Sequence, residues 1–401
     1  MGRRQRMAAS YDVVAIRSDL PALRDVTYLN FGTEGVMAES VLAKYFEVLG
    51  RFERYGHYER MRIVEHMQAC RERVGKIVKA YASEVSITRN GTDGVSIVLG
   101  SFPFQEGDEL LIGGEEHPAI VYPAFALQKT RGVIVRRFPF HHDPSQTLRA
   151  FAAALTPKTR FVAFSHVSCE TGIRNPAKAI ISIAHARGVP VLLDGAQTIG
   201  CLDIDFPDLG ADFLTGSAHK WLCGPKGTGI LVIRTDKLDS LTPAYVGGGS
   251  FAEGFPWDKL GEPASVTFEW APGAARFEYG MRNPATYAGL NFAIDHLDSL
   301  GWKSIHSHQR SMTEDLKRRL GAVPGIRIQT PMSWSDSSPI VNVAVEGVRG
   351  RDVSQKLWND YAIVQRAVRD PDGVRISTGY CTTTADHDRL IQALTVIART
   401  N

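Results

Sequence analysis

The sequence predicts an α/β protein whose main domain holds a mostly parallel β-sheet with helices on both faces. Three observations support this. The 401 residues exceed what one core usually holds, so two domains are expected. Between residues 108 and 233, short apolar runs alternate with helical stretches, the pattern of strand–helix–strand units. The last hundred residues mix strands and helices differently, which favours a smaller α+β domain at the C-terminal end.

The expected elements follow the chain in order. Strands are expected at residues 108–112, 132–135, 160–164, 189–193, 212–215 and 229–233, and in the smaller domain at 341–344 and 374–377. Helices are expected at 119–130, 148–154, 176–186, 286–300, 311–320 and 385–397. Asn175 is the expected N-cap of the helix at 176–186, and Gly188 its stop. Glycines and prolines from 247 to 275 indicate a connecting region.

These elements divide the chain into an N-terminal arm (1–25), a large domain (26–275) and a small domain (276–401) on which the N-terminal segment packs. The arm starts with the basic residues Met1–Arg6. No apolar stretch follows them before Ser10, so neither a secretory nor a twin-arginine signal is expected. We expect a frayed basic tail instead.

Composition narrows the class of protein. Hydrophobic residues make up 44% and charged residues 22%, which is typical of a globular enzyme. The net charge of +3 indicates no nucleic-acid partner. The chain has no run of 18 apolar residues, so no transmembrane helix is expected. The cysteines are odd in number, and their spacing fits neither a metal site nor a disulfide framework. We therefore expect reduced thiols in a cytoplasmic protein: Cys70, Cys169, Cys201, Cys223 and Cys381.

Two strand ends carry groups that suit chemistry. In parallel sheets, ligands bind beyond the carboxyl ends of the strands. Asp194 ends an apolar strand there, although an aspartate in this place often only caps a turn. Lys220 follows the strand at 212–215, and a lone lysine is usually a solvated charge. Its apolar neighbours Trp221–Cys223 would lower its pKa and make it an amine nucleophile.

Two further segments add weaker signals. The glycine-bearing loop 90–94 precedes an apolar run, and a loop that opens a helix presents N–H groups and a positive dipole end to a phosphate. His117 follows a strand directly after Glu116. Pyridoxal 5′-phosphate (PLP) needs an amine for its Schiff base, a carboxylate for its pyridine nitrogen and a phosphate anchor. The chain offers a candidate for each, so PLP is the predicted cofactor.

The stretch Asp194-Gly195-Ala196-Gln197, followed by Ser217-Ala218-His219-Lys220-Trp221-Leu222, resembles the class V aminotransferases of PLP fold type I. That superfamily includes cysteine desulfurases, C–S lyases and isopenicillin-N-epimerase-like proteins. The resemblance runs from Tyr28-Leu29-Asn30 to the C-terminal helix. It implies a seven-stranded sheet in the large domain and a homodimer with its active site at the subunit interface.

The resemblance also implies roles for individual residues. Lys220 would carry the Schiff base and move the proton at Cα, Asp194 would pair with the pyridinium nitrogen, and His117 would stack on the ring. Gln197 would bind the phenolic oxygen. The phosphate would be held by Gly91, Thr92, Asp93, Ser217 and His219. Substrate contacts would come from Arg375, which would grip the α-carboxylate, and from Asn30 and Arg282. The partner subunit would add contacts from around Gly248 or Asn283.

Departures from the family pattern narrow the reaction. Desulfurases carry a persulfide-accepting cysteine shortly before the carboxylate-binding arginine, and residues 363–373 contain none. Cys169 stands where desulfurases have an asparagine near the cofactor. The first hypothesis is therefore a C–S lyase that performs α,β-elimination on an S-substituted cysteine. Transamination or epimerisation on the same scaffold is the alternative, and a non-enzymatic regulator is a remote one. Arg282 and Arg366 would add positive charge for a second polar group on the substrate.

Overall fold

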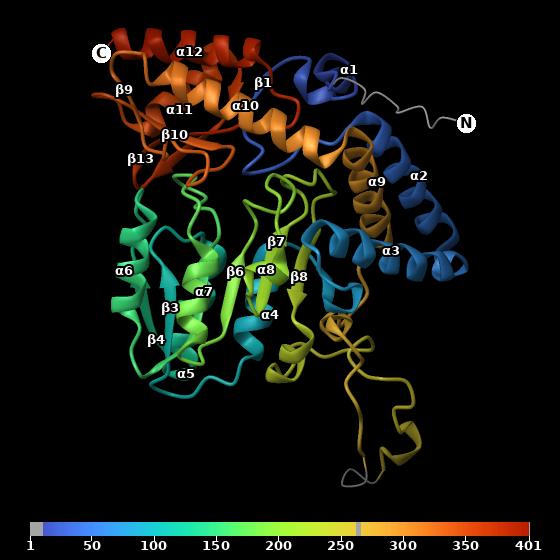
Figure 1. Cartoon of the computed structure of the whole chain (residues 1–401). Helices are drawn as coiled ribbons and strands as arrows, with labels where there is room; N and C mark the ends of the chain where they lie inside the picture. Colours follow the sequence, from blue (N-terminus) through green and yellow to red (C-terminus); the bar gives the residue numbers. More distant parts are fainter. Residues whose placement is uncertain (1–10, 262–265, 401) are drawn as a thin grey trace, which may run out of the picture.

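The chain folds around a seven-stranded and a four-stranded β-sheet (Figure 1), in a computed structural model that describes residues 11–261 and 266–400. The larger sheet has the spatial order β2-β8-β7-β6-β5-β3-β4. Its strands are β2 Val85–Thr88, β3 Glu109–Gly113, β4 Ile134–Phe138, β5 Thr159–Ser165, β6 Val191–Asp194, β7 Phe213–Ser217 and β8 Gly229–Ile233. Strands β7, β6, β5, β3 and β4 pair in parallel, and β8 pairs antiparallel with β7 and β2. The predicted mostly parallel, seven-stranded sheet is confirmed.

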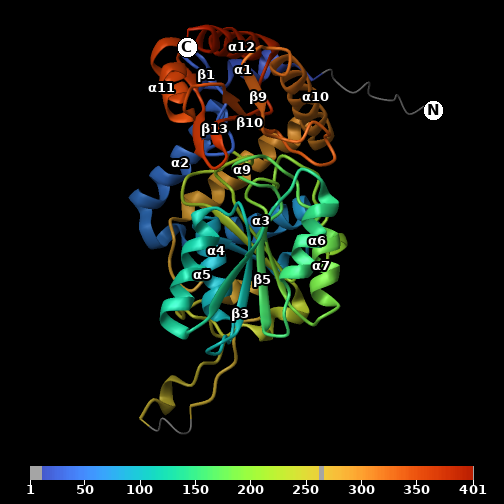
Figure 2. The same cartoon turned by 90° about the vertical axis from the view of Figure 1, so that its left-hand side faces the viewer.

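Both faces of this sheet are buried under helices (Figure 2). Helices α4 (Gly91–Ser101) and α5 (Pro118–Arg131) cover one face, and α6 (Pro144–Ala154) and α7 (Ala177–His185) cover the other. Successive residues of β5 alternate between the two apolar clusters, since side chains along a strand point to opposite faces. Burial on both sides explains why these strands are almost continuously apolar.

The small sheet is antiparallel and has the order β12-β13-β10-β9. The C-terminal elements are β9 Ile326–Ile328, β10 Ile340–Val345, β12 Arg366–Arg369, β13 Asp372–Ser377 and the helices α10 Trp302–Leu320, α11 Gly350–Tyr361 and α12 Thr384–Arg399. The N-terminal segment lies against this part of the chain: β1 (Thr27–Tyr28) pairs with β11 (Ile363–Val364), and Arg17 in α1 (Val13–Ser18) forms a 2.7 Å ion pair with Asp386.

The domain boundary at residue 276 stays a prediction. Helix α9 (Pro284–Leu300) follows that boundary, yet it packs on α2 (Glu39–Tyr55) and α3 (Arg60–Val78) (Figure 1). The remaining helical elements are short: α8 Phe206–Leu209, η1 Pro21–Leu23, η2 Gly56–Glu59, η3 Ala82–Glu84, η4 Thr235–Ser240, η5 Trp257–Lys259 and η7 Ala274–Phe277. The connecting region expected from 247 to 275 contains no α-helix and no strand where it is described, and part of it extends away from the body of the molecule (Figure 1).

Several local expectations were wrong. The helix expected at 311–320 begins earlier, at Trp302. Asn175 does not cap α7; its side-chain amide instead donates to the carbonyl of Ser165 at the end of β5 (2.8 Å). The strand expected at 132–135 starts later, because Gly132 has a positive φ of 67° and ends α5. The basic tail Met1–Arg6 lies outside the described residues. Within residues 11–261 and 266–400, no helix has the length and apolar character needed to cross a bilayer.

Candidate active site

A cavity at the carboxyl ends of β5, β6 and β7 brings most of the predicted site residues together. Its lining comes from five segments of the large domain that are far apart in the sequence. The lining residues are Gly91, Thr92, His117, Ala119, Ser165, Val167, Cys169, Asp194, Ala196, Gln197, Ser217 and Lys220. The residues that the strand-end argument selected therefore lie together at one edge of the sheet.

Asp194 is the last residue of β6 and is buried between the ends of β5 and β7. Its Oδ1 accepts the backbone N–H of Ala196 (2.8 Å), and no described residue donates to Oδ2. Burial raises the pKa of Asp194, while the positive charge of Lys220 opposes that rise. A buried carboxylate with one free oxygen suits a ligand that brings its own N–H donor.

Lys220 lies three residues after the end of β7, in the turn that leads to Cys223. Burial lowers its pKa, Asp194 opposes this, and the guanidinium groups of Arg375 and Arg366 add to the lowering. A lowered pKa increases the fraction of free amine, which is the nucleophilic form.

Two protein contacts fix the orientation of the Gln197 side chain. Trp221 Nε1, which can only donate, faces Oε1 at 2.9 Å, and the carbonyl of Gly32, which can only accept, faces Nε2 at 2.9 Å. Both contacts require the same amide orientation. The second N–H of the amide is left for a ligand in the cavity, as expected for a contact to a phenolic oxygen.

His117 is the N-cap residue of α5, and its imidazole is neutral in this environment. Its Nδ1 accepts the backbone N–H of Ala119 (3.1 Å), which places the ring proton on Nε2. Burial lowers the pKa of His117 to about 4, and the cations Lys220, Arg366 and Arg375 contribute. A neutral imidazole at the N-terminus of α5 can lie against an aromatic ring without adding charge.

The N-terminus of α4 also lines the cavity, through Gly91 and Thr92. Gly91 N–H donates to Ser217 Oγ (3.2 Å), so the helix start and the end of β7 are joined there. Thr92 is exposed to the cavity, and its N–H has no partner among the described residues. Unpaired N–H groups at a helix start suit a phosphate.

The phosphate contact expected of Asp93 has to be corrected. Its backbone N–H was expected to face a phosphate, but it donates to the Asn90 side chain (2.8 Å), which caps the helix. Its carboxylate forms an ion pair with Arg89 (2.7 Å). His219 directly precedes Lys220. Its Nδ1 lies 3.4 Å from the carbonyl of Thr228, and its Nε2 has no hydrogen-bond partner among the described residues.

Arg375 reaches the site from β13 and is fully buried. Its guanidinium donates to the Cys169 carbonyl (2.9 Å), Asn30 Oδ1 (3.1 Å) and Thr33 Oγ1 (2.5 Å), while the buried Nε has no partner among the described residues. Burial, followed by the charge of Arg366, lowers its pKa to about 10. The structure thus brings Arg375 and Asn30 together, and a buried guanidinium with a spare donor favours an anion.

Arg282 is not brought to this cavity. Its guanidinium donates to the carbonyl of Ile87 on β2 and lies over the ring of Tyr279 (5.9 Å). Asn283, the other residue considered for a partner's site, accepts the N–H of Ala285 and caps α9.

Sequence reasoning missed three residues that organise the site. Glu116 accepts the N–H (2.8 Å) and hydroxyl (2.6 Å) of Ser165, and burial raises its pKa to about 8. Trp221 orients Gln197. Gly32 lies where an added Cβ would be 2.8 Å from Ser377 Oγ. Only Glu116 had a signal in the sequence, a carboxylate directly before His117.

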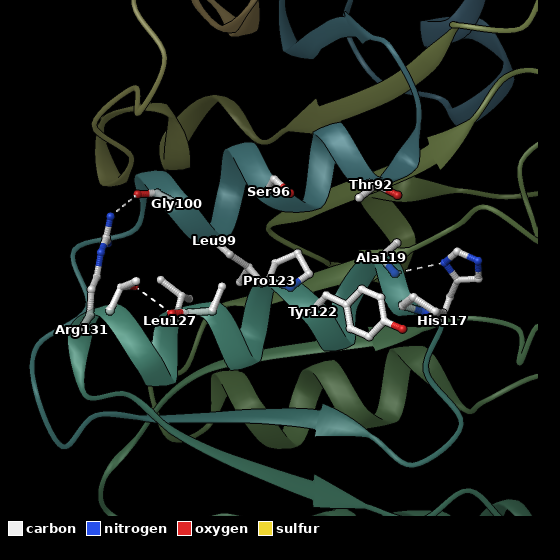
Figure 3. Close-up of a pocket in the computed structure, with 13 residues that line it drawn as sticks. Thr92, Ser96, Leu99, Gly100, His117, Ala119, Tyr122, Pro123, Leu127 and Arg131 are labelled. Atoms are coloured by element: carbon white, nitrogen blue, oxygen red, sulfur yellow. Dashed lines mark hydrogen bonds between the residues drawn. The ribbon is translucent and has the colours of Figure 1, made fainter.

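An apolar groove between α4 and α5 continues from this cavity (Figure 3). It encloses about 590 Å³, starts at Thr92, His117 and Ala119, and ends near Arg131. Those first three residues line both spaces. The groove is therefore continuous with the candidate site.

The lysine, carboxylate and amide groups at these strand ends, with the start of a helix lining the same cavity, are the arrangement of a PLP enzyme of fold type I. The chain matches the family model "Aminotransferase class-V" over residues 36–388, and it belongs to that family. It is a PLP-dependent enzyme. A probable cysteine desulfurase of Methanothermobacter thermautotrophicus is 31% identical over 78% of this chain and 76% of its own length. The isopenicillin N epimerase of Streptomyces clavuligerus is 30% identical over 81% of this chain and 83% of its own length.

Two structures of the protein C-DES show the same fold. One is a lysine-to-alanine variant with glycine covalently linked to the PLP cofactor; its TM-score is 0.86 at 29% identity, covering 94% of this chain and 98% of that one. The other is described as a cystine C–S lyase in complex with its reaction product cysteine persulfide. Its TM-score is 0.85 at 28% identity, covering 94% and 99%.

Proposed function

We propose that this enzyme is a C–S lyase that performs α,β-elimination on an S-substituted cysteine. The observation that carries the proposal is the segment before Arg375. Residues 363–373 contain no cysteine and form β11, β12 and the turn into β13, so they offer no thiol to receive sulfur. All five cysteines are buried. The similarity to C-DES, described as a cystine C–S lyase, supports the same reaction class.

PLP, when bound, supplies the electron sink that stabilises negative charge at Cα. The residues described above fit that group. Asp194 Oδ2 would accept the pyridinium N–H, the free N–H of Gln197 would bind the phenolic oxygen, and neutral His117 would lie against the ring. The phosphate of PLP would be held by Thr92, Ser217 and His219, because the Gly91 N–H already donates to Ser217 Oγ.

The remaining residues act on the substrate. Arg375, with Asn30 beside it, would hold the α-carboxylate and so fix which bond at Cα lies nearest Lys220. The Lys220 amine would accept the Cα proton. The Cβ–S bond then breaks, the sulfur leaves as a thiol, and the three-carbon remainder takes up water to give pyruvate and ammonia. Epimerisation at Cα is the second candidate, favoured by the similarity to isopenicillin N epimerase. We also propose a cytoplasmic homodimer.

The test is a product assay with the PLP-loaded enzyme and a panel of S-substituted cysteines. Pyruvate formed without any keto-acid cosubstrate is the expected result, and Lys220→Ala should abolish it. Stoichiometric consumption of a keto acid would instead identify an aminotransferase. Solvent deuterium at Cα with loss of optical rotation would identify an epimerase. Alanine and persulfide formed from free cysteine would identify a desulfurase and overturn the proposal.

A further inference from the structure

A lysine in helix α10, outside the cavity, is fully buried and forms no ion pair with the described residues. The Nζ of this residue, Lys317, donates to the carbonyls of Pro331 and Met332 (2.9 Å each) and to Ser337 Oγ (2.8 Å). A lysine ammonium has three donors and no acceptor, so all of its donors are satisfied. Because all three acceptors belong to the segment 331–337, Lys317 holds that segment in one conformation.

The same part of the chain, which connects β9 to β10, binds the loop 168–174 that follows β5. Four hydrogen bonds join the two segments. They are Thr330 Oγ1 to Thr171 O (2.5 Å), Ser338 Oγ to Gly172 O (3.2 Å), Arg174 N to Asp336 O (2.9 Å) and Arg174 Nε to Ser337 O (3.0 Å). The Arg174 guanidinium also lies over the ring of Trp334 (5.6 Å). The position of the loop 168–174 therefore depends on the segment that Lys317 holds.

The loop 168–174 reaches the active site through Cys169. This residue lines the cavity together with Lys220, and its carbonyl accepts from Arg375 Nη1 (2.9 Å). The other two hydrogen bonds of the Arg375 guanidinium come from Nη2 and go to Asn30 and Thr33. The Cys169 carbonyl is thus the acceptor that fixes the Nη1 side of the guanidinium, and a shift of the loop would change its orientation.

These contacts form one continuous path from α10 to the arginine of the active site. Resting on the proposed function, in which Arg375 holds the α-carboxylate, we propose that Lys317 is a positioning residue for that arginine. Lys317 holds the segment 331–337 against the loop 168–174, and so keeps the Cys169 carbonyl and the Arg375 guanidinium in the orientation that binds the carboxylate. The lysine itself touches neither substrate nor cofactor.

The consequence is a selective effect on ligands. Loss of the Lys317 contacts should weaken ligands that have an α-carboxylate and spare ligands that lack one. A lysine that only supported the fold would lower stability and affect both kinds of ligand alike.

The test compares L-norleucine with pentylamine, which is the same molecule without its α-carboxylate. Neither has a leaving group at Cβ, so binding to the PLP-loaded enzyme is measured without elimination, from the absorbance change of the bound cofactor. Lys317→Met keeps an unbranched side chain and removes the three donors. The preference for norleucine over pentylamine should fall about 10- to 100-fold, the loss expected when a binding group is displaced by about 1 Å. The dissociation constant of pentylamine should stay unchanged.

Two further variants keep the test valid if Lys317→Met folds poorly. Ser337→Ala removes one of the three acceptors and should lower the same preference by a smaller factor. Leu316→Ala is the matched control, because Leu316 is the buried neighbour of Lys317 on α10 and packs in the apolar cluster of the small sheet. It should lower the melting temperature and leave the preference unchanged.

A double variant tests whether Lys317 acts through Arg375. The preference in Lys317→Met/Arg375→Lys should be no lower than in Arg375→Lys alone, because residues that act through one another are not additive. Losses that multiply in the double variant would overturn the inference. Equal weakening of both ligands in Lys317→Met and Ser337→Ala, or no weakening of either, would overturn it as well.

Failure of the proposed function gives a different result. Absent pyruvate from S-substituted cysteines, with a norleucine preference that depends on Lys317, would contradict the proposed reaction alone. Pyruvate formation with a preference that does not depend on Lys317 would contradict the positioning role alone.

Discussion

Replacing Gly32 with alanine adds a methyl group next to the side chains of Ser377, Arg375 and Gln197. Gly32 is buried, and its carbonyl accepts from Gln197 Nε2. A Cβ added there would lie 2.8 Å from Ser377 Oγ, 3.3 Å from Arg375 Cζ and 3.3 Å from Gln197 Oε1. The first distance is shorter than real Cβ contacts allow, so at least one of these side chains must shift.

The size of the effect follows from how tightly these neighbours are held. Arg375 has three hydrogen bonds and no exposed surface, and Gln197 is held between Trp221 and Gly32 itself. Overpacking such a region costs about 1–3 kcal/mol of unfolding free energy. A displacement of the carboxylate-binding group by about 1 Å costs about 100-fold in rate.

The assay measures three quantities in Gly32→Ala: the melting temperature, the cofactor absorbance, and kcat/KM for pyruvate formation. We expect bound cofactor, a modestly lower melting temperature and a kcat/KM about 100-fold lower. Gly100→Ala is the matched control, because its Cβ would contact only Ala244 at an ordinary 3.5 Å and an alanine favours the helix. Full activity in Gly32→Ala would refute the argument that this glycine makes room for Arg375 and Gln197.

Three further predictions follow from the site. Trp221→Phe removes the donor to Gln197 Oε1; the cofactor should stay bound with a shifted absorbance maximum, and an unchanged spectrum would contradict this. Arg375→Lys should raise KM at least 10-fold, since an ammonium cannot form the paired contacts; an unaltered KM would be evidence against the α-carboxylate contact. Burial lowers the pKa of His166 to about 3 in the folded protein. As the pH falls below about 6.5, the histidine therefore becomes protonated in the unfolded chain but stays neutral in the folded one. Stability should therefore fall as the pH drops from about 6.5, and His166→Phe should flatten that decline in melting temperature.

The sequence was sufficient for groups whose positions follow from local pattern. Asp194 and Lys220 each follow an apolar strand, and parallel strands end at one edge, so their proximity was predictable. The helix start at Gly91 was predictable from a different local pattern, because a glycine-bearing loop precedes an apolar run there. The structure brings these groups into one cavity.

Other features depend on contacts between distant parts of the chain. Trp221 and Gln197 are 24 residues apart, and no period or motif signals their hydrogen bond. The position of Arg366 opposite Arg375 follows from the register of a hairpin. Asn175 was misassigned because asparagine caps helices and also donates to distant carbonyls, and only tertiary structure decides between these uses.

The central claim, that Lys220 carries the cofactor, is tested most directly by borohydride reduction followed by peptide mass analysis. The purified enzyme should be yellow, and reduction should fix one cofactor covalently to the peptide that contains Lys220. Lys220→Ala should yield no modified peptide. Cofactor fixed to a different lysine, or a protein that stays colourless with added PLP, would contradict this account of the site.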